Sequence, residues 1–165
     1  MRKSAIALCF IALAGTATIA LPATTTTTFA VTAVVGASCS LGTVTTLGFG
    51  TYDPLSAIDN DATTSISVTC TLLTPYNVGL SAGTTSGATV AQRKMQGLTP
   101  ANTLNYNLYS NAGRTVIWGN TIGSNTVTGT GNGLAQNLTV YGRIANGTAA
   151  NTDTYSDTIT VTVTY

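Results

Sequence analysis

The sequence predicts an all-β domain, and three observations carry this prediction. Only 7% of the 165 residues are charged, and there is neither His nor Glu. Lys and Glu, which cover the surfaces of helices, are therefore almost missing, whereas Thr and Val, which favour strands, are frequent. Short runs with apolar residues at every second position alternate with turn-rich segments, as is typical of a β-sandwich. We expect about six strands in two layers.

Residues 1–23 have the parts of an export signal. Arg2 and Lys3 form a positive start, and the apolar stretch that follows is shorter than the ~20 residues of a membrane span. Both Ala20 and Ala23 suit cleavage. We therefore expect an exported mature chain of one domain, without an integral membrane segment after signal removal.

Charge after signal removal excludes several classes of partner. The mature chain keeps four basic residues against five acidic ones, a net charge of −1. Such a chain lacks the basic surface that binds nucleic acid or anionic lipid. We expect neither as a partner.

The segment 24–35 has the pattern of a strand at the free N-terminus of the mature chain. Phe29, Val31, Ala33 and Val35 fall on one face at period two. Such a strand can pair within its own sheet, or it can be donated to the open sheet edge of a neighbouring molecule.

Strand-like runs continue along the rest of the chain. In order they cover residues 44–49, 64–70, 76–80, 93–98, 104–109, 115–118, 138–144 and 157–165. Residues 83–88 read as a turn and residues 119–133 as an irregular loop, because Gly, Ser, Asn and Thr dominate them.

Three of these runs alternate most clearly, and each therefore predicts one buried face. Their apolar faces are Ile66, Val68 and Cys70; Leu104, Tyr106 and Leu108; and Ile159, Val161, Val163 and Tyr165. The last run extends to the final residue without the Pro, Lys or covering tail that usually protects an exposed edge.

Two cysteines remain once Cys9 leaves with the signal. An exported protein in an oxidising compartment is expected to join Cys39 and Cys70. A nucleophilic or metal-binding thiol would need a basic or imidazole neighbour, and neither Cys39 nor Cys70 has one nearby in the sequence.

Candidate catalytic and ligand sites are weak. Asp153 and Asp157 flank Tyr155 and could form the carboxylate pair of a glycosidase, although ordinary turn positions explain them better. The segment 59–61 has oxygen ligands suited to calcium but lacks the rest of a calcium loop. We expect no enzyme, cofactor or metal site.

Aromatic residues offer one further possibility. Trp118, Tyr106, Tyr109 and Tyr141 could form a platform for a sugar, but aromatic side chains in strand registers more often pack in the core or on a sheet face.

Several motifs together resemble the spore coat protein U domain family, whose best understood members are major pilins of archaic chaperone–usher pili. They are Cys39, SISVTC ending at Cys70, the LNYNLY strand followed by Arg114, VYGRI at residues 140–144, and Tyr155-Ser156-Asp157 before the last strand. The resemblance covers the whole mature chain. It implies an incomplete immunoglobulin-like sandwich, which lacks its final strand and is completed by donor-strand exchange.

The resemblance also implies roles for particular residues. Residues 24–35 become the donor strand, in which Phe29, Val31, Ala33 and Val35 fill the groove of a neighbour, Ala33 being smaller than the usual aliphatic residue. Cys39 and Cys70 match the family disulfide. The mature start in this family, about fifteen residues before the first cysteine, favours cleavage after Ala23. The acceptor groove would have an edge strand that presents Ile159, Val161, Val163 and Tyr165.

The resulting hypothesis is a structural pilin subunit that supports attachment and biofilm formation at the cell surface. Residues 36–165 would form the sandwich. Its partners would be other copies of itself, a periplasmic chaperone and an outer-membrane usher. Alternatives are a self-contained, lectin-like secreted module, with residues 24–35 in its own sheet, and a coat protein of a resting cell.

Overall fold

The computed structural model describes residues 21–165, so most of the expected signal peptide, residues 1–20, lies outside the described residues. The chain divides into two units, Met1–Val34 and Val35–Tyr165. Residues 21–34 of the first unit have no assigned secondary structure and exposed side chains.

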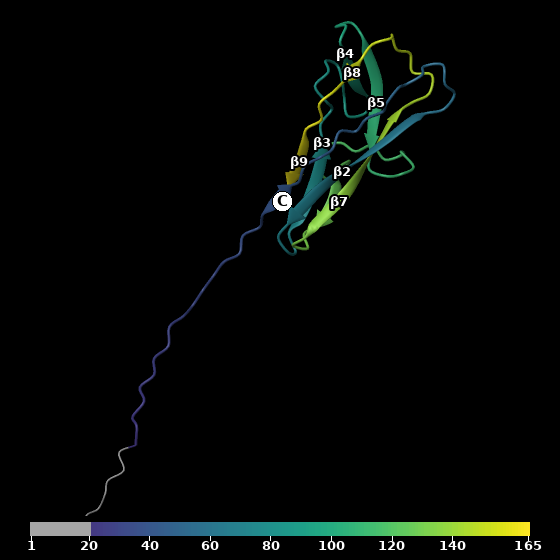
Figure 1. Cartoon of the computed structure of the whole chain (residues 1–165). Helices are drawn as coiled ribbons and strands as arrows, with labels where there is room; N and C mark the ends of the chain where they lie inside the picture. Colours follow the sequence, from purple (N-terminus) through teal and green to yellow (C-terminus); the bar gives the residue numbers. More distant parts are fainter. Residues whose placement is uncertain (1–20) are drawn as a thin grey trace, which may run out of the picture. The chain divides into compact units, whose positions relative to one another are not determined.

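The second unit is an all-β, immunoglobulin-like sandwich (Figure 1). A six-stranded sheet has the order β1-β2-β7-β5-β4-β8, and a three-stranded sheet has the order β6-β3-β9. The described residues, 21–165, include no helix that could cross a membrane. The strands are β1 (Cys39–Leu41), β2 (Asn60–Cys70), β3 (Pro75–Leu80), β4 (Arg93–Gly97), β5 (Thr103–Tyr109), β6 (Val127–Thr130), β7 (Ala135–Ile144), β8 (Tyr155–Ser156) and β9 (Val161–Thr164).

The core lies between the inward faces of the two sheets. Because side chains alternate along a strand, each sheet contributes every second residue. The faces predicted for residues 64–70 and 104–109 are confirmed, since Ile66, Val68 and Cys70 in β2 are buried, as are Leu104, Tyr106 and Leu108 in β5. The core is completed by Tyr76, Val78, Leu80, Trp118, Val140 and Ile144.

The predicted disulfide between Cys39 and Cys70 is confirmed. Cys39 in β1 is paired directly with Cys70 at the end of β2, and their Cα atoms are 4.1 Å apart. A crosslink that closes a loop of this length stabilises a fold by roughly 3–4 kcal/mol in the loop-entropy model.

Two strand predictions are wrong, and the short strands β1, β6 and β8 lie outside the predicted runs. Residues 44–49 carry no strand assignment, and residues 115–118 form only an isolated bridge between Ile117 and Tyr109. The backbone N–H of Trp118 still donates to the Leu108 carbonyl of β5 at 2.9 Å. Its side chain is buried in the core, where the indole N–H donates to the Val78 carbonyl at 2.8 Å. The stretch 119–133, predicted as a loop, contains β6, which pairs with β3.

The last predicted strand is only partly correct. Residues 157–165 do not form one strand, because the chain changes sheets within this stretch. β8 pairs with β4 in the six-stranded sheet, and β9 pairs with β3 in the three-stranded sheet. Residues 157–160 form the crossover between them.

A buried arginine joins the two sheets. Arg93 in β4 is 0% exposed. Burial lowers the pKa of its guanidinium, while the nearby Tyr106 and Asp157 act in the opposite direction. The charge is accommodated because every nitrogen of the guanidinium finds an acceptor. The acceptors are the carbonyls of Ser81 (2.8 Å), Val90 (3.3 Å), Leu80 (3.1 Å) and Trp118 (2.7 Å), and Oδ1 of Asn107 (3.0 Å).

Candidate functional site

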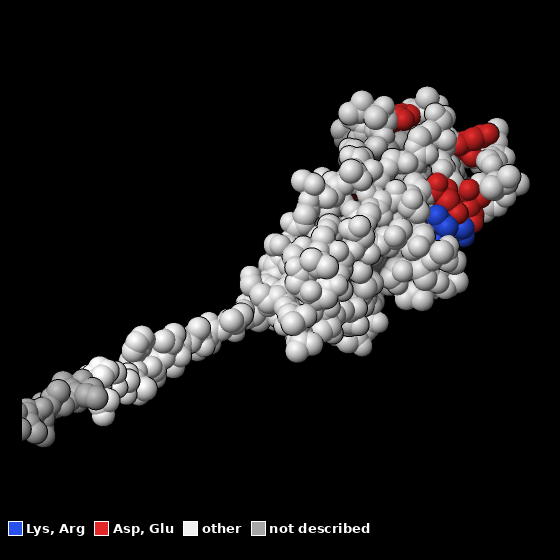
Figure 2. Space-filling model, turned by 60° about the horizontal axis from the view of Figure 1, so that its bottom comes forward, with Lys and Arg blue, Asp and Glu red and all other residues white. Residues whose placement is uncertain are grey.

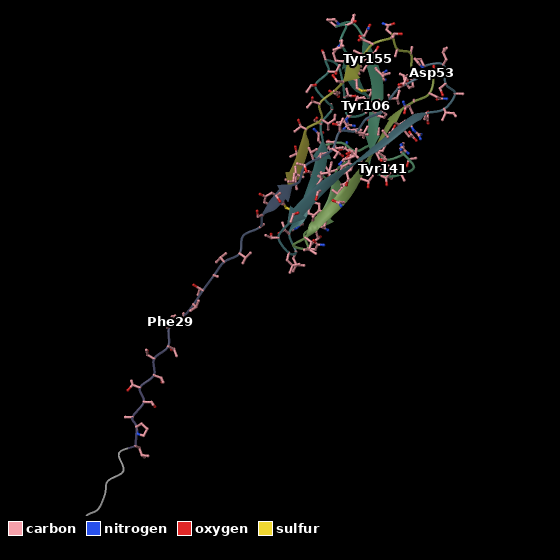
Figure 3. The ribbon with its side chains drawn as sticks, viewed as in Figure 1. Phe29, Asp53, Tyr106, Tyr141 and Tyr155 are labelled. Atoms are coloured by element: carbon pink, nitrogen blue, oxygen red, sulfur yellow. A yellow bond between two sulfur atoms is a disulfide. The ribbon has the colours of Figure 1, made fainter. Side chains whose placement is uncertain are left out.

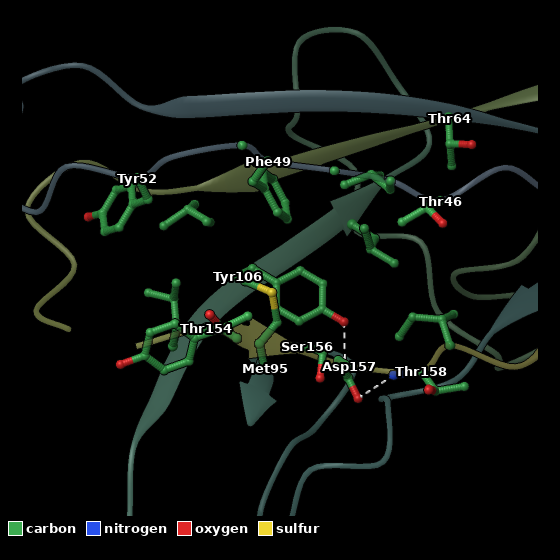
Figure 4. A pocket seen from close by; sticks show the side chains of 18 of the residues that line it. Thr46, Phe49, Tyr52, Thr64, Met95, Tyr106, Thr154, Ser156, Asp157 and Thr158 are labelled. Carbon is green, nitrogen blue, oxygen red and sulfur yellow. Dashed lines mark hydrogen bonds between the residues drawn. The ribbon is translucent and has the colours of Figure 1, made fainter. Parts of the chain in front are cut away.

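A groove of about 1020 Å³ opens between the two sheets of the second unit. Apolar side chains line it from both sheets, and Figure 4 shows Phe49, Met95 and Tyr106 facing its interior. Further lining side chains include Ile66, Leu80, Leu108, Val140, Ile159 and Val161. A compact sandwich would fill this space with its own strand, so the groove marks a place where the fold is open.

One rim of the groove consists of residues 44–52. Leu47 and Phe49 are half-buried against the core, so their side chains share one face of this rim. Within the described part of the chain, however, residues 44–52 form no backbone–backbone hydrogen bond. This rim is held through side chains instead, for example by Asn60, whose amide donates to the Phe49 carbonyl at 3.1 Å. A chain segment without backbone–backbone hydrogen bonds at the edge of a sheet is a ready template for another strand.

The second rim consists of residues 154–161, which include β8 and the crossover. β8 and β9 each lie at the edge of their sheet, so one side of this rim is paired and the other faces the groove. Residues 44–52 run antiparallel to β2, because Thr45 contacts Thr64 and Phe49 contacts Asn60. The successive antiparallel pairings through β7, β5 and β4 make β8 parallel to β2, so the two rims run in opposite directions.

Asp157 fixes the crossover. Its carboxylate accepts hydrogen bonds from the Tyr106 hydroxyl at 2.7 Å, from the Thr84 N–H at 2.8 Å and hydroxyl at 3.1 Å, and from the Thr158 N–H at 2.8 Å. Gly83 permits this arrangement, because it has a φ of +94° and a Cβ there would collide with the carboxylate. The Tyr106–Asp157 and Asp157–Thr158 bonds are visible inside the groove in Figure 4.

Tyr106 carries this polar contact in apolar surroundings. Burial, together with the hydrogen bond to Asp157, raises the pKa of its hydroxyl far above the usual value, so the group stays a neutral donor. Its ring also meets Phe49 edge to face, with centroids 6.0 Å apart. The Phe49 and Tyr106 rings and the Asp157 carboxylate therefore lie next to one another in the groove.

The structure places the predicted edge residues at different positions. Ile159 and Val161 line the groove. Val163 packs against the core, whereas Tyr165 is 57% exposed and does not line the groove. Residues 44–49 of the other rim were predicted only as a strand, and nothing in the sequence indicated that they border a groove.

The predicted donor residues lie in the segment without secondary structure. Phe29, labelled in Figure 3, is 87% exposed, and Val31 is 84% exposed. Ala33 and Val35 are exposed as well. Leaving a Phe and several aliphatic side chains in water is unfavourable, and such a stretch usually marks an interaction segment.

The other candidate sites do not assemble. Asp153 and Asp157 each have donors of their own, and those of Asp153 are the Thr99 N–H and the Asn102 amide, both at 2.9 Å, and the Thr154 N–H at 2.8 Å. Hydrogen bonding, first from Thr99, lowers the pKa of Asp153 to about 2. No cluster of three potential metal ligands occurs among residues 21–165.

The aromatic residues form no single platform. Trp118 and Tyr106 are buried in the core, whereas Tyr109 and Tyr141 are paired across β5 and β7 and remain partly exposed. Figure 3 shows Tyr106 and Tyr141 at separate places on the ribbon. Arg114 stacks over the Tyr141 ring, 5.6 Å from its centroid.

The segment suggested for calcium instead takes part in an ion-pair network. The carboxylate of Asp61 accepts hydrogen bonds from Nε and Nη2 of Arg143 at 2.7 and 2.9 Å, and it lies 3.1 Å from Nη1 of Arg114. The carboxylate of Asp59 lies 2.8 Å from Nη1 of Arg143. Figure 2 shows acidic and basic atoms side by side there, on a face that is otherwise mostly neutral. The hydrogen bond from Arg143 lowers the pKa of Asp61.

This lowered pKa predicts a pH dependence. The network stabilises the fold above the ordinary pKa of 3.8, and this contribution is lost as the pH falls through the lower pKa of folded Asp61. Because Asp61 is partly exposed, the contribution is no more than about 1 kcal/mol. We expect purified Asp61→Asn protein to unfold at lower urea concentration than wild type near neutral pH, and the two midpoints to converge in acid. A midpoint difference that stays constant into strong acid would contradict this ionic role.

A comparison with protein families is decisive for classification. The model of the Spore Coat Protein U domain matches residues 25–162. The chain belongs to the Spore Coat Protein U domain family. The match includes the segment 25–35, both cysteines and both rims of the groove, so the groove described above is a feature of a Spore Coat Protein U domain.

Two related proteins extend this comparison. Protein U of Myxococcus xanthus is 38% identical over 155 residues, which cover 87% of this chain and 86% of the relative. A solved structure with a similar fold is the CsuC–CsuE chaperone–tip adhesion subunit pre-assembly complex from archaic chaperone–usher Csu pili of Acinetobacter baumannii. There the TM-score is 0.55 at 25% identity, over 79% of this chain but 40% of that chain. The Spore Coat Protein U domain thus spans less than half of that solved chain.

Proposed function

We propose that this protein is a structural subunit that polymerises by donor-strand complementation. Residues 24–35 of one copy would lie in the groove of the next copy, between residues 44–52 and residues 154–161. The observation that carries the proposal is the open groove, whose first rim forms no backbone–backbone hydrogen bonds. An inserted strand would supply both the missing hydrogen bonds and the missing apolar layer.

The dimensions of the segment and of the groove support this assignment. At about 3.3 Å per residue, the rim formed by residues 154–161 is roughly 26 Å long, and residues 24–35 are long enough to fill it. Burial of each exposed Phe or Val side chain would contribute roughly 1.5–3 kcal/mol to the free energy of association. The subunit makes no covalent chemistry in this role.

The assembly route follows from the same groove. An unfilled apolar groove promotes aggregation, so the newly exported subunit needs a temporary partner that covers the groove. We assign this role to a periplasmic chaperone, followed by an outer-membrane usher that exchanges it for the next subunit. The similarity to a chain from a chaperone–subunit complex supports the chaperone. The product would be a surface fibre that mediates attachment and biofilm formation.

A second candidate, a coat protein of a resting cell, is favoured by the 38% identity to Protein U over nearly the full length of both chains. A self-contained, lectin-like module has less support, because residues 24–35 carry no strand assignment.

Electron microscopy and shearing of cells that express the chain test the proposal. We expect thin fibres that shear off as multimers and resist dissociation. Monomers in the sheared fraction, or protein confined to a continuous layer around resting cells, would contradict the fibre role.

A further inference from the structure

The polar cluster inside the groove has a consequence for how a strand can lie there. Resting on the proposed function, we propose that Tyr106 and Asp157 set the register of the inserted strand. Ala33 of one copy lies over this pair in the next copy, with Val31 beside Ile159 and Phe29 beside Val161.

The hydrogen-bonding state of Asp157 selects a small apolar residue. Its carboxylate already accepts four hydrogen bonds, so it needs no donor from an incoming strand. A large aliphatic side chain pressed against it would remove its remaining water without replacing that hydration. The Phe49 and Tyr106 rings already occupy space at this level. Ala33 has the smallest side chain on the alternating face of the segment, and it therefore fits here best.

The part of the groove beside Ile159 and Val161 has room for large side chains. Ile159 and Val161 are only half-buried, and Val161 is paired with the buried Leu80 of β3. With Ala33 over Asp157, an antiparallel strand places Val31 and Phe29 at these two positions, where they complete the burial of the rim.

The direction of the strand follows from the rims. Tyr155, Asp157, Ile159 and Val161 line the groove and are half-buried, whereas the residues between them are exposed, so residues 154–161 can support a regular ladder. The other rim is interrupted at Gly50, which has a φ of +66°. Antiparallel pairing is the more stable kind per residue, so we place it along residues 154–161. A parallel strand with Ala33 over Asp157 would instead bring Phe29 to Asp153, beside polar groups.

Cysteine crosslinking reads this register directly. The full chain carries Ile159→Cys together with one of Phe29→Cys, Val31→Cys, Ala33→Cys or Val35→Cys, and the fibres are oxidised after shearing. Directly opposed residues have Cβ atoms about 4.5–5.5 Å apart, and a small shift of the backbone brings them to the roughly 3.5–4.5 Å of a disulfide, whereas diagonal neighbours are too far apart. The only other mature cysteines are bonded to each other.

We expect Val31→Cys to give the strongest ladder of covalent multimers on non-reducing gels. A dominant Ala33→Cys or Phe29→Cys ladder would overturn the register by a shift of two residues, and a dominant Val35→Cys ladder would overturn the direction; all three results leave the fibre role intact. Absence of multimers with all four pairs, in a strain whose wild-type chain forms no fibres, would overturn the proposed function together with the register.

A size change gives an independent test. Ala33→Leu adds bulk at the crowded level of the groove, and we expect it to reduce fibre yield about tenfold. Val31→Leu, the matched control at the roomier level, keeps a yield near wild type. Both residues are exposed in the free subunit, so neither change affects its folding. Equal yields from the two variants would overturn the assigned register.

Discussion

Val31→Asp subunits are expected to be exported and oxidised but to be missing from surface fibres. In the free subunit Val31 is 84% exposed, so a carboxylate there costs nothing. In the proposed fibre the same carboxylate would lie unpaired in the core of a neighbour, at a cost of about 3 kcal/mol or more. That cost lowers the equilibrium for joining two subunits at least ~100-fold. The measurement is the amount of subunit in sheared fibres relative to the amount in the periplasm.

Thr32→Asp is the matched control. Thr32 is also exposed, and it lies on the opposite face of the same segment, so its side chain would point out of the groove. This variant should assemble almost as well as wild type. Equal loss of fibres in both variants would show that added charge, and not the buried face of a donor strand, prevents assembly.

Arg93→Met is expected to destabilise the isolated subunit by roughly 3 kcal/mol or more. The substitution leaves the buried carbonyls of Leu80 and Trp118 and the part-buried carbonyl of Ser81 without their donor, and each buried unsatisfied group costs about 1–3 kcal/mol. The expected result is a large shift of the urea unfolding midpoint of the purified protein.

Two further variants separate charge from geometry. Lys94→Met removes a cation from the adjacent, half-buried position of β4 and should change stability little. Arg93→Lys keeps the charge, but its single ammonium cannot reach the five acceptors of the guanidinium, so an intermediate loss is expected. Equal midpoints for Arg93→Met and Lys94→Met would exclude a structural role for the buried guanidinium.

The sequence supported the prediction of those elements whose signal is local. Alternation in β2 and β5 depends on which residues face the core, and a period of two reveals this without knowledge of partners. Residues 44–49 alternate in the same way, with Leu47 and Phe49 inward, yet a strand also requires a backbone partner, which local sequence cannot supply. The same reason explains why β6, short and rich in Thr and Gly, was missed.

The groove likewise depends on contacts between distant residues, which local sequence does not show. Ile159 and Val161 were found from alternation, but the role of Asp157 depends on Tyr106 and Thr84, which are distant in sequence. Nothing local distinguishes the buried Arg93 from its neighbour Lys94. Only the pairing of β4 with β5 and the approach of the second sheet place the guanidinium among carbonyls.

The disulfide has a mechanical consequence. Tension applied to residues 24–35 would be transmitted to the sandwich at Cys39 in β1. This strand has only three residues, so few hydrogen bonds would resist its separation from β2. The covalent bond passes this force to Cys70, at the end of the 11-residue β2. Because β2 is paired with β7 over ten positions, tension would be shared along a long ladder in the middle of the sheet. Reduction of this disulfide would therefore lower the force at which a fibre breaks, and this loss would exceed what the change in thermal stability of the subunit suggests.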